Sequence, residues 1–232
     1  MLAKKYKSEL ISINNPFESI YTLEFKSLNG RYKYHPGQFL HIAIDSDYDG
    51  SGQWPESRCF SMQSNPDEET VKITYAVKGK FTQQLEQNLK VGSPVYLKLP
   101  YGDLFTQPHN KVNTVFIAGG TGITPFLSLF THNSFKEYIN PRMYLGFRSY
   151  AYNIYENELN IVKLHNPIEN LCDPNFFYED VNGLIDICLI FTENGINSDY
   201  FISGPPTMIK AFKQTLIVKG VPAHQVLTDD WE

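Results

Sequence analysis

The sequence has few cysteines and no long apolar run, and both absences exclude classes of protein. Only three of its 232 residues are cysteine, and Cys59, Cys172 and Cys188 lie far apart. That spacing fits neither a disulfide scaffold nor an iron–sulfur or other metal site. No apolar run approaches the length that crosses a bilayer, and none follows the charged N-terminus as in a secretory signal. We therefore expect a cytoplasmic protein without a membrane span and without a bound metal.

Positive charge is also scarce. Lys and Arg total 20 against 25 Asp and Glu, which gives a formal net charge of −5. This balance argues against nucleic acid or an anionic membrane surface as the main partner. The length suits one large domain or two of ordinary size.

The pattern of turns and apolar residues changes near residues 106–111 and predicts two domains, 1–107 and 108–232. In the first, turn residues separate short strands expected at 20–25, 39–44, 71–77 and 95–99, with one brief helix at 82–88. This pattern predicts a small antiparallel β-barrel.

The second domain is predicted to be an α/β domain with a parallel sheet covered by helices, because strand-like and helical runs alternate. The expected strands are 112–118, 143–147, 184–191 and 200–203, and the expected helices are 125–130, 155–165 and 206–218. The irregular stretch 166–182 is assigned to no element.

The most informative segment is the glycine turn at residues 119–125, between an apolar strand and a helix. Thr124 is expected to cap that helix, and Pro125 to occupy its first position. Glycines at the positive end of a helix let a phosphate or a flat ring approach the backbone. The turn therefore predicts a nucleotide site, with a turn that binds no ligand as the alternative.

Two familiar nucleotide motifs do not fit this turn. A P-loop needs a Lys after its last glycine, where Ile123 stands. The dinucleotide fingerprint needs a third glycine at the position of Pro125 and a carboxylate after the next strand, where Arg148 and Ser149 follow.

Other segments add to the case for a nucleotide. A second segment with few bulky side chains is Ser203-Gly204-Pro205-Pro206, which ends an expected strand and begins a helix, as the glycine turn does. In the first half, Arg58-Cys59-Phe60-Ser61 supplies a cation suited to phosphate and an aromatic face suited to a heterocycle.

Together these motifs resemble the ferredoxin–NADP reductase family of flavin reductases, over nearly the whole chain and in the same order. Arg58 to Ser61 resembles the family's Arg-x-Tyr/Phe-Ser flavin motif, and His35 to Phe39 the Pro-Gly-Gln-Phe segment before it. Pro100 to Phe105 resembles the Pro-x-Gly-x-Phe ending of the barrel. The glycine turn resembles the family's pyridine-nucleotide motif, and Ser203 to Met208 its Cys-Gly-Pro-Pro-x-Met motif.

The resemblance implies a set of site residues. Those implied for the flavin are Arg58, Cys59, Phe60, Ser61, Ser64, Tyr75, Val77, Gly79, Lys80, Phe81, Thr82 and Trp231. Those implied for the nicotinamide nucleotide are Gly120, Thr121, Thr124, Arg148, Gly204, Pro205 and Met208. Ser61, Ser203 and Trp231 are the residues implied at the reacting rings.

Some positions depart from the family's pattern or leave a choice open. Phe60 replaces the commoner Tyr, and Ser203 stands where the family has Cys. Trp231 either covers the flavin or belongs to an exposed tail.

FAD is expected rather than FMN, because the segment from Gly79 to Thr82 suits a diphosphate. Arg148 favours NADPH, with NADH possible.

The activity that the resemblance implies is hydride transfer from NAD(P)H to bound FAD, followed by single-electron transfer to a separate carrier. A ferredoxin or flavodoxin is the expected acceptor, and an oxygenase component is the alternative. A flavin-binding subunit that works only within a larger complex also remains open. We expect a monomer.

Overall fold

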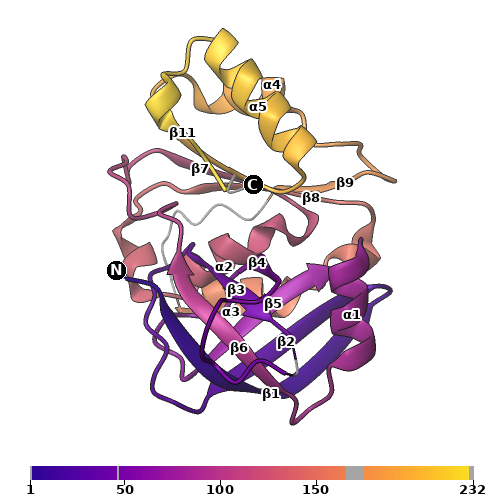
Figure 1. The fold of residues 1–232 in the computed structure, drawn as a ribbon. Coiled ribbons are helices and arrows are strands. Elements are labelled where there is room, and N and C mark those ends of the chain that lie inside the picture. The colour runs from indigo at the N-terminus through magenta and orange to yellow at the C-terminus, as the bar shows by residue number, and fades with distance from the viewer. Residues whose placement is uncertain (1, 46, 166–174, 230–232) are drawn as a thin grey trace. The chain divides into compact units, whose positions relative to one another are not determined.

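The computed structural model describes residues 2–45, 47–165 and 175–229. The chain divides into two compact units, Met1–Asp103 and Leu104–Glu232, which we call the first and second unit (Figure 1). The boundary between them falls a few residues before the one expected at 107 and 108, and the assignment of one cofactor to each unit stays a prediction.

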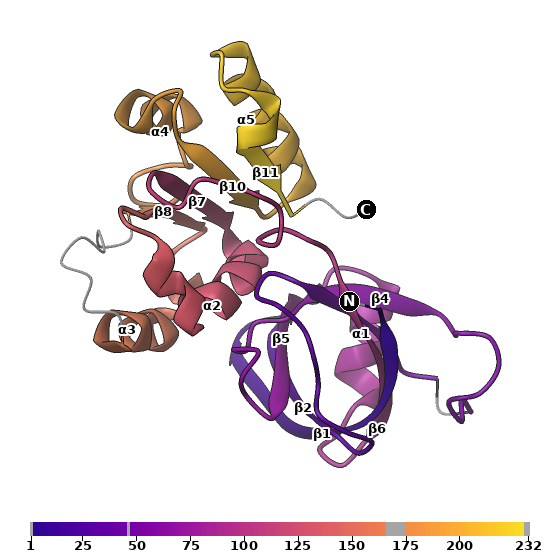
Figure 2. The same ribbon diagram turned by 90° about the vertical axis from the view of Figure 1, so that its left-hand side faces the viewer.

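The first unit is built on an antiparallel sheet of six strands in the order β4-β3-β6-β1-β2-β5. The strands are β1 (Lys4–Phe17), β2 (Ile20–Ser27), β3 (Phe39–Ala43), β4 (Ser57–Ser61), β5 (Thr70–Ala76) and β6 (Pro94–Tyr101). The sheet curls until its two edges approach, and the Gln63 amide donates to the Lys72 carbonyl at 2.8 Å between them (Figure 2). The predicted antiparallel barrel is confirmed.

Alternating side chains fill the interior of this barrel. Leu23 and Phe25 on β2, and Val71 and Ile73 on β5, point inward because residues two apart share one face of a strand. Helix α1 (Lys80–Asn88) adds buried Phe81 and Leu85 to the same core.

The second unit is built on a parallel sheet of five strands in the order β11-β10-β7-β8-β9. The strands are β7 (Thr114–Gly119), β8 (Arg142–Phe147), β9 (Asn175–Tyr178), β10 (Asp199–Ser203) and β11 (Val226–Thr228). The helices are α2 (Thr124–Phe130), α3 (Glu156–His165), α4 (Ile187–Asn194) and α5 (Pro206–Val218). Short 3₁₀ helices cover η1 (Gly120–Ile123), η2 (Asn133–Glu137), η3 (Tyr150–Tyr152) and η4 (Ala223–Gln225).

Helices cover both faces of this sheet, with α2 and α3 on one face and α4 and α5 on the other (Figure 2). The central strand β7 serves both cores, since Phe116 joins the cluster with α2, whereas Val115 and Ile117 join the cluster with α5. Such a strand is apolar throughout because neither face meets water.

The strand order reverses between β7 and β10. From β7 the chain adds β8 and β9 on one side, and it then returns to place β10 and β11 on the other. In open α/β sheets, ligands bind beyond the carboxyl ends of the strands at such a reversal. The glycine turn follows β7, and Ser203 and Gly204 lie at the end of β10, so both predicted edges lie at this point.

The strand expected at 184–191 is wrong, because this segment contains the start of helix α4. Asp186 caps the helix by accepting from the amides of Cys188 at 2.8 Å and Leu189 at 3.2 Å. Gly195 ends it with a φ of +72°. A short apolar run fits a buried strand and a buried helix equally well, and the two terminal signals decide between them.

The expected N-cap role of Thr124 is also wrong. Thr124 is already helical, with φ −55° and ψ −44°, because η1 precedes α2 without a break. Its hydroxyl donates to the Thr121 carbonyl at 3.0 Å instead of accepting from the helix. Pro125 still lies in the first turn.

A buried carboxylate joins the beginning and the end of the second unit. Asp199, at the start of β10, accepts from the Asn110 amide at 2.5 Å and from the Gln225 side-chain amide at 3.0 Å. Within the described ranges, no helix combines the length and the apolar character needed to cross a membrane.

Candidate cofactor sites in the two units

In the first unit, Arg58 lies against the start of helix α1. Its guanidinium is 5.3 Å from the centre of the Phe81 ring and makes an ion pair of 3.1 Å with Glu56. About half of the Arg58 side chain is exposed, so the cation is accessible. An exposed guanidinium beside a helix N-terminus is suited to binding phosphate oxygens.

Thr82 shapes the loop that enters α1. Its hydroxyl accepts from the amides of Lys78 at 2.9 Å and Gly79 at 3.0 Å, and donates to the Gly79 carbonyl at 2.9 Å. The amides at the first positions of α1, Lys80 and Phe81, have no acceptor within a helix. Val77 is held nearby, its amide donating to the Ser19 carbonyl at 2.7 Å. The loop therefore presents amide donors beside Arg58.

Phe60 and Tyr75 form an aromatic pair next to these groups. Their ring centres are 5.7 Å apart, and Tyr75 is almost completely buried. Among the described residues, nothing pairs with the Tyr75 hydroxyl. Burial, with lesser effects of Tyr21 and Glu86, raises the pKa of Tyr75, so it remains a hydrogen-bond donor. A buried donor without an acceptor is costly, and a bound ligand would supply one.

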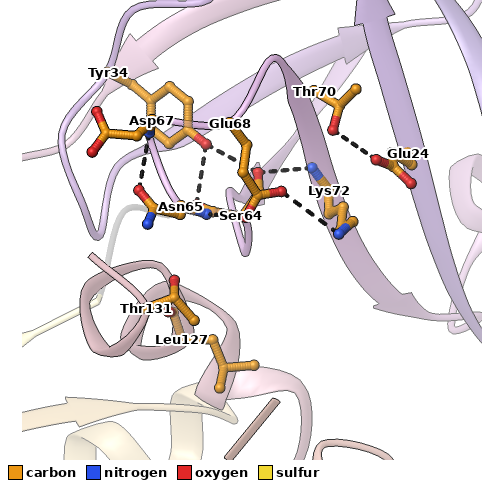
Figure 3. A network of polar contacts seen from close by, with 10 residues as sticks. All are labelled: Glu24, Tyr34, Ser64, Asn65, Asp67, Glu68, Thr70, Lys72, Leu127 and Thr131. Atoms are coloured by element: carbon orange, nitrogen blue, oxygen red, sulfur yellow. Dashed lines mark hydrogen bonds and ion pairs between the residues drawn. The ribbon is translucent and has the colours of Figure 1, made fainter. Parts of the chain in front are cut away.

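The other residues predicted for the flavin have different surroundings. Cys59 contacts His41 with its sulfur, on the outer side of the barrel. The Ser64 hydroxyl is buried in a polar network, where it bonds the Tyr34 hydroxyl at 2.9 Å and accepts from the Lys72 amide at 3.0 Å (Figure 3). Ser61 is also buried, at the end of β4. Ser64 thus joins β5 to the segment that contains Tyr34.

In the second unit, the two glycine segments touch through their backbones. A Cβ atom on Gly122 would lie 2.5 Å from the Cα and nitrogen of Gly204 and 2.6 Å from the carbonyl carbon of Ser203. Gly204 has a φ of +148°, which favours glycine. The structure therefore brings together two segments about 80 residues apart in the sequence, as predicted from their positions at strand ends.

The remaining residues of these segments line the same region. Gly120 has a φ of +56° and no atom near the position of a Cβ. Met208 and Pro205 lie against Gly119, with the Met208 sulfur 2.9 Å and the Pro205 Cδ 3.1 Å from the place of a Cβ there. Thr121 is half-buried beside them.

Ser203 is buried at the end of β10, and its hydroxyl donates to the Asp229 carboxylate at 3.2 Å. The Asp229 amide in turn donates to the Ile202 carbonyl at 3.0 Å. Asp229 was not among the predicted site residues, because it lies 26 residues from Ser203 in the chain and reaches it through the parallel pairing of β10 with β11.

Arg148, at the end of β8, is exposed and lies 5.8 Å from the centre of the Tyr152 ring. The structure also brings two acidic residues to this strand end. The Glu179 amide donates to the Phe147 carbonyl at 2.9 Å, and the Asp180 amide donates to the Arg148 carbonyl at 3.3 Å. The sequence analysis did not locate these residues because they lie within the stretch 166–182, which it assigns to no element.

Trp231 lies outside the described residues. Across the part of the chain that the structure describes, no three His, Cys, Asp or Glu side chains gather in a way that could hold a metal ion.

Comparison with curated proteins finds reductase subunits of oxygenases. The chain is 26% identical over 242 residues to the reductase component of propane 2-monooxygenase from Mycolicibacterium goodii, covering 97% of this chain and 67% of that protein. It is 25% identical over 229 residues to flavohemoprotein A from Dictyostelium discoideum, covering 90% of this chain and 55% of that protein. The chain thus spans between about half and two thirds of these relatives. No family model matches.

Solved structures show the same fold. A cytochrome P450 reductase from Amycolatopsis superposes with a TM-score of 0.80 at 14% identity, covering 98% of this chain and 70% of that one. Phthalate dioxygenase reductase superposes with a TM-score of 0.75 at 17% identity, covering 97% and 67%. In its sequence the chain is thus similar to reductase components of oxygenases, and in its two-unit fold to solved reductases of the ferredoxin–NADP reductase type.

Proposed function

We propose that the protein is an NAD(P)H-dependent flavin reductase that binds FAD and delivers electrons to a separate acceptor protein. The observation that carries this proposal is the pair of sites: a cationic, aromatic site in the first unit and a backbone-lined site at the strand reversal of the second. A cytoplasmic location and a monomeric state, both expected from the sequence, are part of the same proposal.

The residues of the first unit suit FAD. Arg58 and the amides at the start of α1 supply donors for a diphosphate. The Phe60 ring supplies a flat apolar surface for a heterocycle, and the Tyr75 hydroxyl is a buried donor without an acceptor. Ser61, Ser64, Val77 and Cys59 remain proposed members of this site.

The residues of the second unit suit a nicotinamide nucleotide. Gly120, Gly122 and Gly204 keep side chains away from the carboxyl ends of β7 and β10, so a ligand can approach the backbone there. We place Thr121, Thr124, Pro205 and Met208 around this nucleotide. Ser203, held by Asp229, and Thr124 are buried polar groups of the region.

The chemistry itself belongs to the cofactors: bound FAD accepts two electrons from NAD(P)H as a hydride and can release them one at a time. The protein holds and orients the reactants, and well-oriented reactants supply a large part of the rate. No side-chain acid or base is required for a hydride transfer. The role of Ser61 and Ser203 is therefore to position groups by hydrogen bonding.

The test is the absorbance spectrum of the purified protein supplied with FAD, followed by anaerobic addition of NADPH. We expect a flavin spectrum that bleaches on addition. A protein that retains no flavin after FAD is supplied would refute the proposal.

The acceptor is proposed from the relatives. The propane 2-monooxygenase relatives are reductase components of an oxygenase, which favours an oxygenase component as the partner. A ferredoxin or flavodoxin is the other candidate. Incubating the reduced protein with each class of acceptor distinguishes them, because only the correct partner reoxidises the flavin rapidly.

Flavin binding without turnover is the competing function, since the sequence also allowed a subunit active only within a complex. Reduction of an artificial acceptor such as ferricyanide by the isolated chain separates the two. Rapid reduction supports the reductase, and FAD binding without NAD(P)H oxidation supports the subunit.

The choice of nicotinamide depends on the end of β8. The exposed Arg148 guanidinium suits the 2′-phosphate of NADPH, and we propose NADPH on that ground. Asp180, hydrogen-bonded through its backbone to Arg148, places a carboxyl group on the neighbouring strand end, which suits the ribose hydroxyls of NADH. Bleaching rates with the two nucleotides decide: faster bleaching by NADH overturns the preference.

A further inference from the structure

An acidic residue, Glu56, lies against the candidate FAD site of the first unit. Residues two apart in a strand share one face, so Arg58 and Phe60 lie on the same face of the edge strand β4. Phe60 packs against the barrel core, and Arg58 lies over the start of α1. Glu56 precedes Arg58 by two residues, and its Oε1 lies 3.1 Å from Arg58 Nη2. The carboxylate therefore shares the face that the flavin site uses.

Three contacts hold the Arg58 guanidinium. Nη1 donates to the Ser57 carbonyl at 2.8 Å, Nη2 donates to Glu56 at 3.1 Å, and the group lies 5.3 Å from the centre of the Phe81 ring. A guanidinium binds a phosphate group best as a fork, with N–H donors on two of its nitrogens. Glu56 thus takes up a donor on one of the nitrogens that such a fork needs.

Glu56 is also the only acid in the two sequence segments that supply the phosphate part of the site. The charged residues of segment 56–61 are Glu56 and Arg58, and those of segment 77–82 are Lys78 and Lys80. Both lysines are exposed. Like charges repel, so a carboxylate at this place opposes the approach of a phosphate group. Three cations and one acid thus surround the site, and the acid contacts Arg58.

Arg58 keeps two of its three contacts when Glu56 is removed. The Ser57 carbonyl belongs to β4, where Ser57 pairs with Ala43 on β3, and Phe81 is buried in the core. The Glu56 side chain is 68% exposed, and exposed ion pairs do little to fix long side chains in one geometry. The carboxylate therefore matters more as a competitor for the guanidinium than as its support.

We infer that Glu56 is an autoinhibitory residue of the flavin site. Its carboxylate occupies Arg58 in the free protein and is displaced when the FAD diphosphate binds. The contact lowers the affinity for FAD, because the ion pair must separate before the phosphate can take its place. This inference rests on the proposed function, since it takes FAD as the ligand of Arg58.

The test is a fluorescence titration of the flavin-free full chain with FAD at low salt, for the wild type and Glu56→Gln. Glutamine keeps the size of the side chain and removes its charge. We expect Glu56→Gln to bind FAD roughly threefold more tightly, or about 0.6 kcal/mol, as for an exposed ion pair. Unchanged or weaker binding by the variant overturns the inference. A wild-type protein that binds no FAD refutes the proposed function itself, so the two failures are distinguishable.

Glu137→Gln is the matched control for the charge. Glu137 makes an exposed ion pair with Lys111 in the second unit, so this variant also removes one negative charge and one ion pair, without touching Arg58. Its affinity for FAD should equal that of the wild type. Equal tightening in both variants would overturn the inference, because net charge and not the contact with Arg58 would then set the affinity.

A double-mutant cycle tests whether Glu56 acts through Arg58. In the Arg58→Ala background, Glu56→Gln should leave the affinity for FAD unchanged, and a gain as large as in the wild-type background contradicts the inference. Salt gives a second measurement. At 1 M salt the Debye length is about 3 Å, so the advantage of Glu56→Gln should shrink. An advantage that salt does not alter would exclude competition between charges.

Discussion

The two units build their candidate sites by opposite means. The first uses side chains from three elements: Arg58 and Phe60 on β4, Tyr75 on β5 and Phe81 on α1. The second uses the absence of side chains, at Gly122 and Gly204 above all. Side-chain truncation should therefore damage the first site, and an added methyl group should damage the second.

The largest effect is expected from Gly122→Ala. The new Cβ would meet backbone atoms of Gly204 at 2.5 Å, and backbone cannot rotate away as a side chain can. Overpacking of this kind costs about 3 kcal/mol. Denaturant unfolding should show this loss, and titration with NADPH should show weakened binding.

Gly120→Ala is the matched control in the same turn. Its Cβ would meet no atom within 4 Å, although its φ of +56° costs a non-glycine residue about 1 kcal/mol. Equal losses of stability in the two variants would show that backbone conformation, and not the contact with Gly204, governs the turn.

Arg58→Ala should be the most damaging truncation in the first unit. Loss of hydrogen bonds from a charged donor to phosphate costs about 1.5–3 kcal/mol, which weakens FAD binding by roughly 10- to 100-fold. Fluorescence titration with FAD measures the change. Arg31→Ala removes an equal charge from a residue that donates to the Asp67 carbonyl and is not proposed for the FAD site, so FAD binding by that variant should be unaffected. Parallel losses in both variants would mean a nonspecific effect of charge.

Tyr75→Phe should raise the stability of the free protein and lower its affinity for FAD. Without ligand, removing a buried hydroxyl that has no partner should stabilise the protein by about 1 kcal/mol. With FAD, the lost donor should weaken binding by about fivefold, corresponding to about 1 kcal/mol. Unfolding of the free protein and FAD titration measure the two quantities.

Tyr32→Phe is the control for these two effects of Tyr75→Phe. The Tyr32 hydroxyl is also buried but donates to Ser8 Oγ at 2.7 Å, so its loss should destabilise the free protein by about 1 kcal/mol and leave FAD affinity unchanged. If Tyr75→Phe behaves like Tyr32→Phe, the Tyr75 hydroxyl has a partner in the free protein.

The smallest effect concerns pH and the first unit alone. Burial, and secondarily Lys98, lowers the pKa of His41 below its ordinary value of 6.5. As pH falls through that value, the unfolded chain takes up the proton before the folded one does, so stability declines. The melting temperature should fall from pH 7.5 to pH 5 less steeply in His41→Gln than in the wild type. Identical slopes would exclude a contribution from His41.

Most of the fold could be predicted from local patterns. In the first unit, turns rich in glycine, proline and asparagine predicted the positions of most strands. In the second unit, the helix over residues 206–218 was predicted with its observed bounds. The helix at α4 was missed because its short apolar run has no clear period, although Asp186 and Gly195 mark its ends. Strand β9 (Asn175–Tyr178) was missed because it lies within residues 166–182, where the sequence shows no regular pattern.

The sequence predicted those parts of the candidate sites that follow from the order of strands and helices. It did not predict the contacts between individual side chains. The meeting of Gly122 with Gly204 followed from their places at the ends of parallel strands. The orphan hydroxyl of Tyr75 and the bond from Ser203 to Asp229 depend on side-chain packing, which a single sequence does not specify. The contact of Cys59 with His41 depends on strand register, which turn residues alone leave undetermined.

The carboxylate of Asp199 has a consequence for how the second unit opens locally. It holds Asn110, ahead of the central strand β7, and Gln225, directly ahead of the edge strand β11. The starts of β7, β10 and β11 are thus tied to one buried group. We therefore expect the backbone amides at these three strand starts to exchange with solvent together, as one cooperative unit.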